Sequence, residues 1–292
     1  MKDFTYLAPT TLKAALALLA EHKGKVKVLS GGTDLMLQLQ DGMFSPEFVL
    51  NVKDIPELNT LSYHAKSGLT IGAATSLHSV ETSTILAEKY PHLVTGASEV
   101  GSVQIRNQAS FGGNICTATP SADGTPALVA LDATVRIASV RGERTVPLAE
   151  FFKGVRRTVL EPDELLVDLH IAAPAAHTSG CYVKLNTRPQ MDLAIVGVAA
   201  TVTLTPDGKT IKSAAICLGA VATTPIRIPE AEALLAGQPI SEELLASAGA
   251  AAAKAARPIS DVRASAEYRT EQCDLMTRRA LRVAIERARA AA

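Results

Sequence analysis

The sequence has no tryptophan, and aromatic residues make up only 4% of its 292 positions. A platform of aromatic side chains on which single-stranded nucleic acid could stack is therefore not expected. Twenty-nine basic side chains balance 29 acidic ones, so no net charge attracts nucleic acid or an anionic lipid surface. No run approaches the ~20 apolar residues of a membrane-spanning helix, and no signal peptide is evident. These absences predict a cytoplasmic protein that binds no nucleic acid.

The motifs that hold metals or perform common catalysis are also missing. The chain has four cysteines and six histidines, and none of them stands at the spacing of a zinc or iron–sulfur motif. There is no GxSxG sequence, no P-loop and no GxGxxG fingerprint. We therefore expect no metal held by this chain alone, and we identify no catalytic acid, base or nucleophile.

Two glycine-rich clusters are the most informative feature that is present. Residues 29–34 read Leu-Ser-Gly-Gly-Thr-Asp, and residues 109–114 read Ala-Ser-Phe-Gly-Gly-Asn. Glycine pairs allow positive φ and leave consecutive amide N–H groups unshielded, and such concavities bind phosphate oxygens. One pair is most often an ordinary turn. Two clusters with Thr33, Asn114 and Asp123 beside them predict a site that grips one pyrophosphate from both sides.

Apolar periodicity and turn signals divide the chain into three stretches, with breaks near residues 55 and 175. The first stretch reads as a helix from Leu12, a strand, a glycine loop, a short helix and a second strand. The second mixes strands and helices, including a predicted helix over 77–90 and a buried one over 125–132. A linker at 172–176 leads to the third stretch, which ends in an alanine-rich helical tail from Pro229. The strands predicted in the third stretch are 180–185, 194–204 and 211–218.

Four short motifs stand in order along the chain. They are Gly31-Gly32-Thr33-Asp34, Gln104-Ile105-Arg106-Asn107, Phe111-Gly112-Gly113-Asn114-Ile115 and Pro120-Ser121-Ala122-Asp123. Together they resemble the FAD-binding subunits of molybdenum hydroxylases, especially those of bacterial xanthine dehydrogenases and, more distantly, carbon monoxide dehydrogenase medium subunits. Further matches at 151–154, 160–166, 184–194 and 223–227 extend the resemblance over nearly the whole chain.

The resemblance implies an α+β fold of the PCMH/vanillyl-alcohol-oxidase-like type. Residues 1–55 would form an N-terminal α/β subdomain and residues 56–175 a second α+β subdomain, with FAD sandwiched between them. Residues 176–292 would form a C-terminal flavoprotein domain with a small antiparallel sheet and helices. These boundaries coincide with the breaks read from composition and periodicity.

The resemblance also implies which residues contact FAD. The first pyrophosphate loop would comprise Lys27, Val28, Leu29, Ser30, Gly31, Gly32, Thr33, Asp34 and Leu35. The second would comprise Ala109, Ser110, Phe111, Gly112, Gly113 and Asn114. Asp123 is expected on the adenosine side, and Leu165 or Leu166 in the flavin pocket. Lys184 is expected near the isoalloxazine, where its charge would stabilise the reduced ring, and Val100 is also expected near the flavin.

Two of these residues have simpler roles if the resemblance is set aside. Asp123 could cap the helix that begins near Pro126, and Lys184 could face water from an edge strand. The sequence also departs from animal-type xanthine dehydrogenases, which have aromatic residues at the positions of Val100 and Val155 and an acidic residue at that of Met191. How the flavin face is covered, and what accepts its electrons, therefore stays open.

The function implied by the resemblance is that of an electron-transferring oxidoreductase subunit. A molybdenum cofactor on one partner subunit would oxidise the substrate, and [2Fe-2S] clusters on another would relay electrons to FAD on this chain. NAD⁺ or another acceptor would then be reduced, within a heterotrimer or a dimer of heterotrimers. One alternative is a stand-alone flavin-dependent oxidase or reductase. Another is a scaffold that has lost its cofactor, against which the two intact glycine clusters argue.

Overall fold

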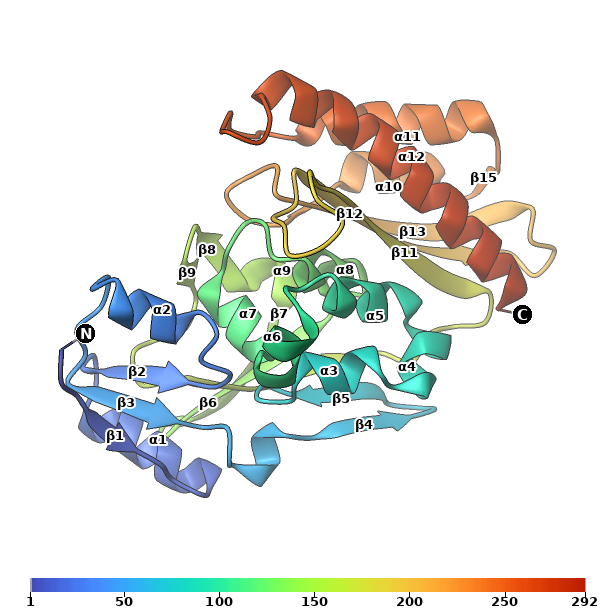
Figure 1. Cartoon of the computed structure of the whole chain (residues 1–292). Coiled ribbons are helices and arrows are strands. Elements are labelled where there is room, and N and C mark those ends of the chain that lie inside the picture. Colours follow the sequence, from blue (N-terminus) through green and yellow to red (C-terminus); the bar gives the residue numbers. More distant parts are fainter. Residues whose placement is uncertain (1, 292) are drawn as a thin grey trace.

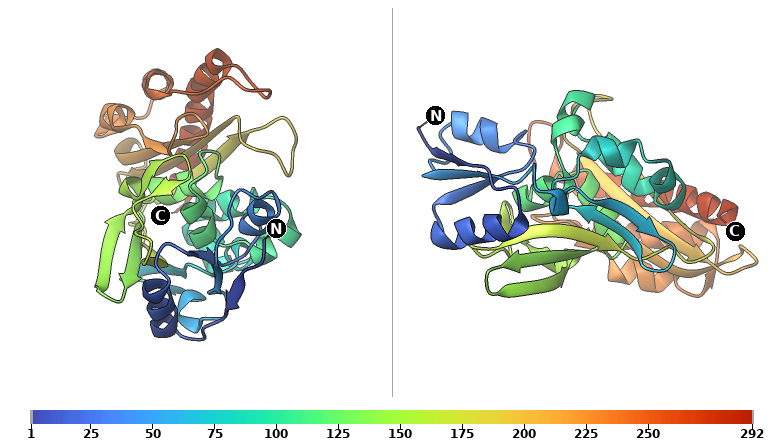
Figure 2. Two further views of the ribbon diagram at one scale, coloured as in Figure 1. Left: turned by 90° about the vertical axis from the view of Figure 1, so that its left-hand side faces the viewer. Right: turned by 90° about the horizontal axis from the view of Figure 1, so that it is seen from below.

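The computed structural model describes residues 2–291 and arranges them in three consecutive parts, each built around its own sheet. In Figure 1 the third part, drawn in yellow to red, lies above the other two. Figure 2 shows that the first part, in blue, projects from one end of the molecule. The site described below lies where the first and second parts meet.

The first part is a small parallel sheet with one helix before and one after its glycine loop. Its strands lie in the order β1-β3-β2, and both pairings are parallel. Thr11 accepts a hydrogen bond from the amide of Ala14 and so starts the first helix. The elements are β1 (Thr5–Leu7), α1 (Leu12–Glu21), β2 (Val26–Leu29), α2 (Leu35–Gln40) and β3 (Phe48–Asn51). They confirm the helix, strand, loop, helix and strand predicted for this stretch.

The second part is an antiparallel sheet in the order β4-β5-β10-β6-β7, with a layer of short helices. The helix predicted over 77–90 is wrong as one element, because Ser83 caps a new helix by accepting from the amide of Leu86. The helices are η1 (Pro56–Leu58), α3 (Leu77–Glu81), α4 (Thr84–Lys89), α5 (Pro91–Ser98), α6 (Val103–Gln108), α7 (Phe111–Thr117), α8 (Gly124–Ala130) and α9 (Leu148–Phe151). The strands are β4 (Leu61–His64), β5 (Gly68–Gly72), β6 (Thr134–Ser139), β7 (Gly142–Pro147), β8 (Phe152–Gly154), β9 (Arg157–Thr158) and β10 (Leu165–Ile171).

The third part is an antiparallel sheet covered by long helices. The three strands predicted there are confirmed, and all of their pairings are antiparallel. The C-terminal helix packs across the first two strands of this sheet, as Figure 1 shows. The elements are β11 (Thr178–Leu185), β12 (Val196–Leu204), β13 (Thr210–Gly219), β14 (Ile226–Arg227), α10 (Pro229–Leu235), β15 (Gln238–Pro239), α11 (Glu242–Ala255) and α12 (Ala266–Ala290).

Shared apolar cores join the three parts. Leu19 of α1 and Leu165 of β10 belong to one buried cluster, which fixes the first part on the second sheet. Every residue of α8 is buried, and this helix packs between the second and third sheets. Gly180 of β11 leaves room for the buried ring of His92, because a Cβ there would stand 2.5 Å from the Nδ1 atom. These contacts set the relative positions of all the segments that form the site.

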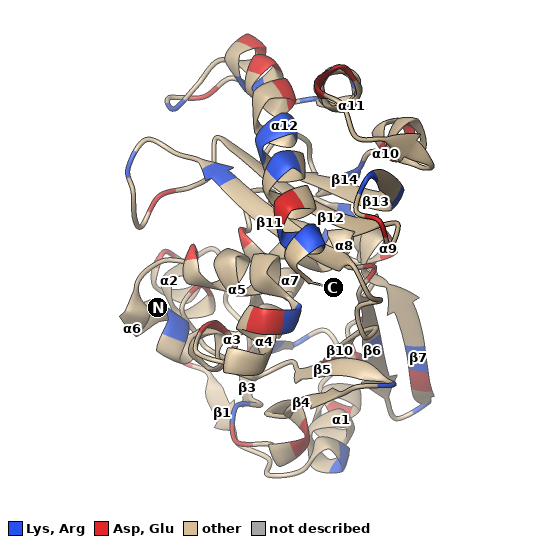
Figure 3. Cartoon of the chain, turned by 90° about the vertical axis from the view of Figure 1, so that its right-hand side faces the viewer, with Lys and Arg blue, Asp and Glu red and all other residues tan. Residues whose placement is uncertain are grey.

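The ribbon in Figure 3 shows both basic and acidic residues along α12. Arg278 pairs with Asp274 of the same helix, and Arg282 pairs with Glu242 of α11. Within residues 2–291, no helix is long and apolar enough to cross a membrane. Two arginines of α12 are thus paired with carboxylates, whereas Arg287 and Arg289 donate to the backbone carbonyls of Gly180 and Gly208.

Candidate cofactor-binding site

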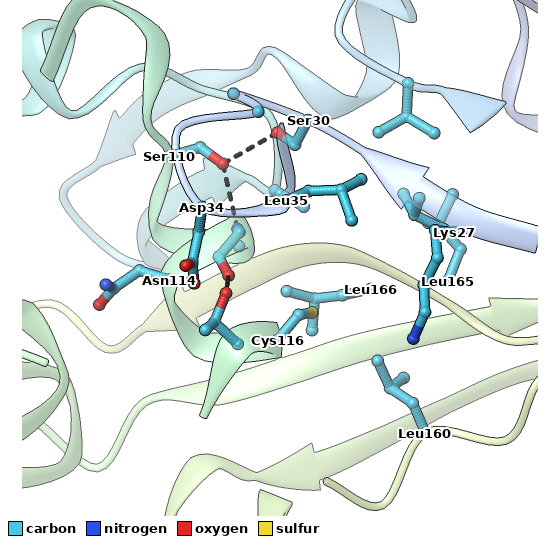
Figure 4. A pocket seen from close by; sticks show the side chains of 18 of the residues that line it. Lys27, Ser30, Asp34, Leu35, Ser110, Asn114, Cys116, Leu160, Leu165 and Leu166 are labelled. Carbon is cyan, nitrogen blue, oxygen red and sulfur yellow. Dashed lines mark hydrogen bonds between the residues drawn. The ribbon is translucent and has the colours of Figure 1, made fainter. Parts of the chain in front are cut away.

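The two glycine clusters meet in space although 80 positions separate them. The Ser30 and Ser110 hydroxyl oxygens lie 3.0 Å apart, as the dashed line in Figure 4 shows. Gly31 rests directly on the backbone before the second cluster, because a Cβ on Gly31 would stand 2.2 Å from the Gln108 carbonyl oxygen. A side chain at position 31 would therefore force the two loops apart.

The glycines serve this contact in different ways. Of the four glycines in the two clusters, only Gly32 has a positive φ, at +72°, so the expectation of positive φ in both pairs is wrong for Gly31, Gly112 and Gly113. Gly112 is needed for close packing, since a Cβ there would stand 2.3 Å from the carbonyl oxygen of Ala73. Gly113 lies in the first turn of α7, where its amide donates to the hydroxyl of the capping serine. Glycine is needed at positions 31 and 112 because another backbone segment lies close to each of them, whereas a left-handed backbone conformation requires glycine only at position 32.

The loops border a cavity of about 390 Å³. Most of the residues expected to contact FAD line it, namely Lys27, Val28, Ser30, Gly31, Gly32, Thr33, Asp34, Leu35, Val100, Ala109, Ser110, Gly112, Gly113, Asn114, Leu165 and Leu166. Leu29 faces a second, shallower hollow behind the first loop. Phe111 is fully buried beneath the second loop. Asp123 and Lys184 do not line the cavity.

The cavity has two unlike ends on either side of the serine pair, as Figure 4 shows. Asp34 and Asn114 lie at one end, whereas Leu160, Leu165 and the Lys27 ammonium lie at the other. An elongated ligand with a phosphate group near its middle and a ring system at each end suits this arrangement. Backbone amides of the two loops would then face the phosphate oxygens.

Two cationic side chains line the cavity. The Lys27 ammonium lies over the Phe44 ring, 3.9 Å from its centroid, and burial lowers the pKa of Lys27. Arg156 has a left-handed φ of +58°, its amide donates to the Ala118 carbonyl, and its guanidinium approaches the Met43 sulfur. Within the part of the chain described, Arg156 forms no ion pair with a carboxylate. The carboxylates of Asp34, Glu161 and Glu164 line the cavity as well, so the two cations suit the anionic part of a ligand that lies near them.

Several lining residues were not identified from sequence. Phe44, Leu160, Cys116 and Arg156 line the cavity. Leu160 belongs to the segment 160–166 noted in the sequence, Arg156 follows Val155, and Cys116 closely follows the second glycine cluster. Phe44 lies in a loop between α2 and β3, and no motif there could have identified it.

Asp123 and Lys184 form a buried ion pair between the second and third parts. The Lys184 Nζ atom lies 2.9 Å from one Asp123 carboxylate oxygen, and the Tyr182 hydroxyl donates to the other at 2.9 Å. The side chains of Lys184 and Asp123 are 3% and 9% exposed. The simpler roles are therefore wrong: Asp123 makes no side-chain cap bond, and Lys184 does not face water although β11 is an edge strand.

The roles expected for Asp123 and Lys184 stay predictions, but this contact limits how the two can be combined. Asp123 was expected on the adenosine side and Lys184 near the isoalloxazine, but groups 2.9 Å apart cannot serve opposite ends of one dinucleotide. Lys184 also donates to the Glu99 carbonyl, 3.3 Å away. Val100 follows Glu99 in the sequence and lines the cavity. Lys184 therefore contacts the residue beside Val100 from outside the cavity.

Two protein-family models together match nearly the whole chain. Residues 2–174 match the model of the FAD binding domain in molybdopterin dehydrogenase, and residues 181–284 match that of the CO dehydrogenase flavoprotein C-terminal domain. The chain is thus a two-domain flavoprotein of the oxidoreductase class. It belongs to the FAD-binding subunits of the molybdenum hydroxylase family, as its resemblance in sequence indicated.

Named relatives and solved structures support this membership. The Nicotinate dehydrogenase FAD-subunit of Eubacterium barkeri is 33% identical over 84% of this chain and 83% of its own length. The xanthine dehydrogenase FAD-binding subunit of Escherichia coli O157:H7 is 32% identical over 98% and 97%. A carbon monoxide dehydrogenase structure from Hydrogenophaga pseudoflava aligns with a TM-score of 0.93 at 32% identity, over 98% of each chain. Quinoline 2-oxidoreductase from Pseudomonas putida 86 gives 0.91 at 29% identity, over 99% and 100%.

The Gly32→Val variant should lose its bound FAD. A Cβ on Gly32 would stand 2.9 Å from the Leu29 side chain, and φ of +72° strains any β-branched residue by about 1–3 kcal/mol. Gly113→Val should have the same effect for another reason, because its side chain would enter the space between the two serines. Bound flavin is measured by visible absorbance and folding by far-UV circular dichroism.

The matched control for backbone strain is Gly237→Val. Gly237 has φ of +74° with no neighbour within 4 Å of an added Cβ, and it lies in the third part. This variant should bear similar strain and keep its flavin. Equal flavin loss in both variants would show that strain, and not the cavity, is responsible.

The stability of the apoprotein should depend on pH through Asp123. Burial raises the pKa of Asp123 to about 6, against the opposing effects of Lys184 and Tyr182. Because the folded chain then binds this proton more tightly than the unfolded chain, the favourable contribution is complete below about pH 4 and is lost as the pH rises through 6. Asp123→Asn should remove this dependence. Urea unfolding of both proteins between pH 4 and 7 tests it, and parallel stability curves would contradict it.

Proposed function

We propose that this chain carries FAD and transfers electrons from [2Fe-2S] clusters of a partner subunit to NAD⁺ or another acceptor. The observation that carries the proposal is the cavity in which two glycine loops meet midway between two ends with different side chains. The residues fit the cofactor, because the glycines at 31, 32, 112 and 113 have no side chain to fill the cavity, and Lys27 and Arg156 supply positive charge. When bound, FAD accepts electrons singly and releases them as a hydride.

Each part of the cavity would hold one part of FAD. Amides of the two loops, with the hydroxyls of Ser30 and Ser110, would bind the pyrophosphate. The end near Leu165 would take the adenosine, and the cavity wall that contains Val100 would face the isoalloxazine. Lys184, fixed behind Val100 by Asp123, would place positive charge near the flavin and so favour its reduced, anionic form. In this arrangement Leu165 lies at the adenosine end and Asp123 on the flavin side. The resemblance in sequence implied the reverse for these two residues.

The chain would act within a larger assembly. Leu37, Met43 and Val155 are exposed apolar side chains, and each stands next to a cavity-lining residue in sequence. A partner that covers them would bring its cluster close to the flavin edge. We place the assembly in the cytoplasm, because all four cysteines are free thiols, as is usual in a reducing compartment.

FAD binding should protect Cys116 from alkylation. Cys116 lines the cavity and is exposed, whereas Cys181, Cys217 and Cys273 are buried. Desolvation raises the pKa of the Cys116 thiol to about 12, so labelling is slow and is compared with and without FAD after the same long reaction time. We expect the full chain to bind FAD stoichiometrically, with visible flavin absorbance, and to lose maleimide labelling at Cys116 when FAD is added. Peptide mass spectrometry locates the label, and Cys116→Ser is the control. Absence of stoichiometric flavin, or equal labelling with and without it, would contradict the proposal.

The endogenous protein should purify with an iron–sulfur subunit and a larger molybdenum subunit. A stable interface buries on the order of 1,600 Å², and the neutral net charge suits association through shape and apolar contact. Native mass spectrometry should show a heterotrimer or its dimer. A flavin-loaded monomer under gentle conditions would exclude the subunit role. Turnover of an organic substrate by that monomer would support the stand-alone enzyme instead.

A further inference from the structure

The second glycine loop is held from behind by a lysine of the first part. The Lys53 Nζ atom donates a hydrogen bond to the Gln108 carbonyl, 2.7 Å away and 55 positions along the chain. Gln108 is the last residue of α6 and immediately precedes the second glycine cluster. The carbonyls of the last helical turn have no partner within the helix, so the ammonium group satisfies one of them at the base of the loop.

The backbone of Lys53 is fixed on both sides. Its amide donates to the Asn51 side-chain oxygen at 3.0 Å, and its carbonyl accepts from Asn59 at 2.6 Å. The Asn51 amide group in turn donates to Asp54. The Lys53 side chain therefore starts from a hydrogen-bonded turn directly after β3. This turn fixes the position from which the side chain extends to α6.

The Gln108 carbonyl oxygen also contacts the first glycine loop at Gly31. An added Cβ on Gly31 would stand 2.2 Å from the Gln108 oxygen, so one atom contacts the first loop and accepts from Lys53. Lys53 lines the shallow hollow behind residues 29–33 and does not line the cofactor cavity. Its positive charge thus lies in the hollow on the other side of residues 30–33 from the cavity, together with the Asp54 carboxylate.

We propose that Lys53 is a positioning residue for the dinucleotide: it holds the two phosphate-binding loops at their binding distance and adds positive charge behind the first of them. This inference rests on the proposed binding of FAD. Lys53 touches no part of the cofactor. It acts through the Gln108 carbonyl, and through the attraction between its ammonium and the two negative charges of a pyrophosphate.

The test compares three variants of the full chain. Lys53→Met keeps the stem and removes the charge, Lys53→Arg keeps charge and donors, and Lys66→Met is the control in an exposed turn between β4 and β5. Because a charge-assisted hydrogen bond is stronger than a neutral one, we expect Lys53→Met to weaken FAD binding about tenfold or more. Lys53→Arg should largely restore it, and Lys66→Met should leave it unchanged. Titration of the apoprotein with FAD, followed by flavin fluorescence, gives the dissociation constants.

Two further readouts separate positioning from a general loss of stability. In Lys53→Met, FAD affinity should depend less on salt concentration than in the parent, because one cation near the phosphates is gone. The thermal shift on FAD addition should shrink more than the apoprotein melting temperature falls. An unchanged FAD dissociation constant, or a lower apoprotein melting temperature with an undiminished shift, would overturn the inference. Failure of the parent chain itself to bind FAD would instead refute the proposed function.

Discussion

The direct contact between two backbone segments, Gly31 on the Gln108 carbonyl, is the constraint on which the site depends. Glycine at position 31 is required because any Cβ would overlap that oxygen. The serine hydroxyls above the contact and the lysine below it reinforce one arrangement of the loops. A cavity of suitable shape follows from this contact, since its walls come from two parts of the chain that would otherwise be independent.

A second constraint is the buried pair formed by Asp123 and Lys184. Desolvation of a buried ion pair costs free energy, and pairing offsets that cost only with good geometry and further hydrogen bonds. Tyr182 and the Glu99 carbonyl supply those bonds. The pair links the third part to the wall of the cavity, so the C-terminal domain contributes to the cofactor site from behind without lining it.

Much of this organisation is readable from the sequence, for identifiable physical reasons. Alternation and turn residues identify β11, β12 and β13, because local periodicity reports which face of a strand is buried. Short helices are harder, since Ser83 divides one apolar stretch by a local cap. The positive φ at Gly32 follows from its place in a turn, whereas the roles of Gly31 and Gly112 depend on backbone that is distant in sequence.

The sequence by itself determined the two glycine clusters, the order of motifs, the family and most of the residues that line the cavity. Only the tertiary structure decided that Asp123 and Lys184, 61 positions apart, form one buried pair, and that Lys53 reaches the base of the second loop. The reason is that periodicity and motifs describe neighbours along the chain. Contacts between separate parts depend on how the shared cores place one sheet against another, and no local pattern encodes that placement.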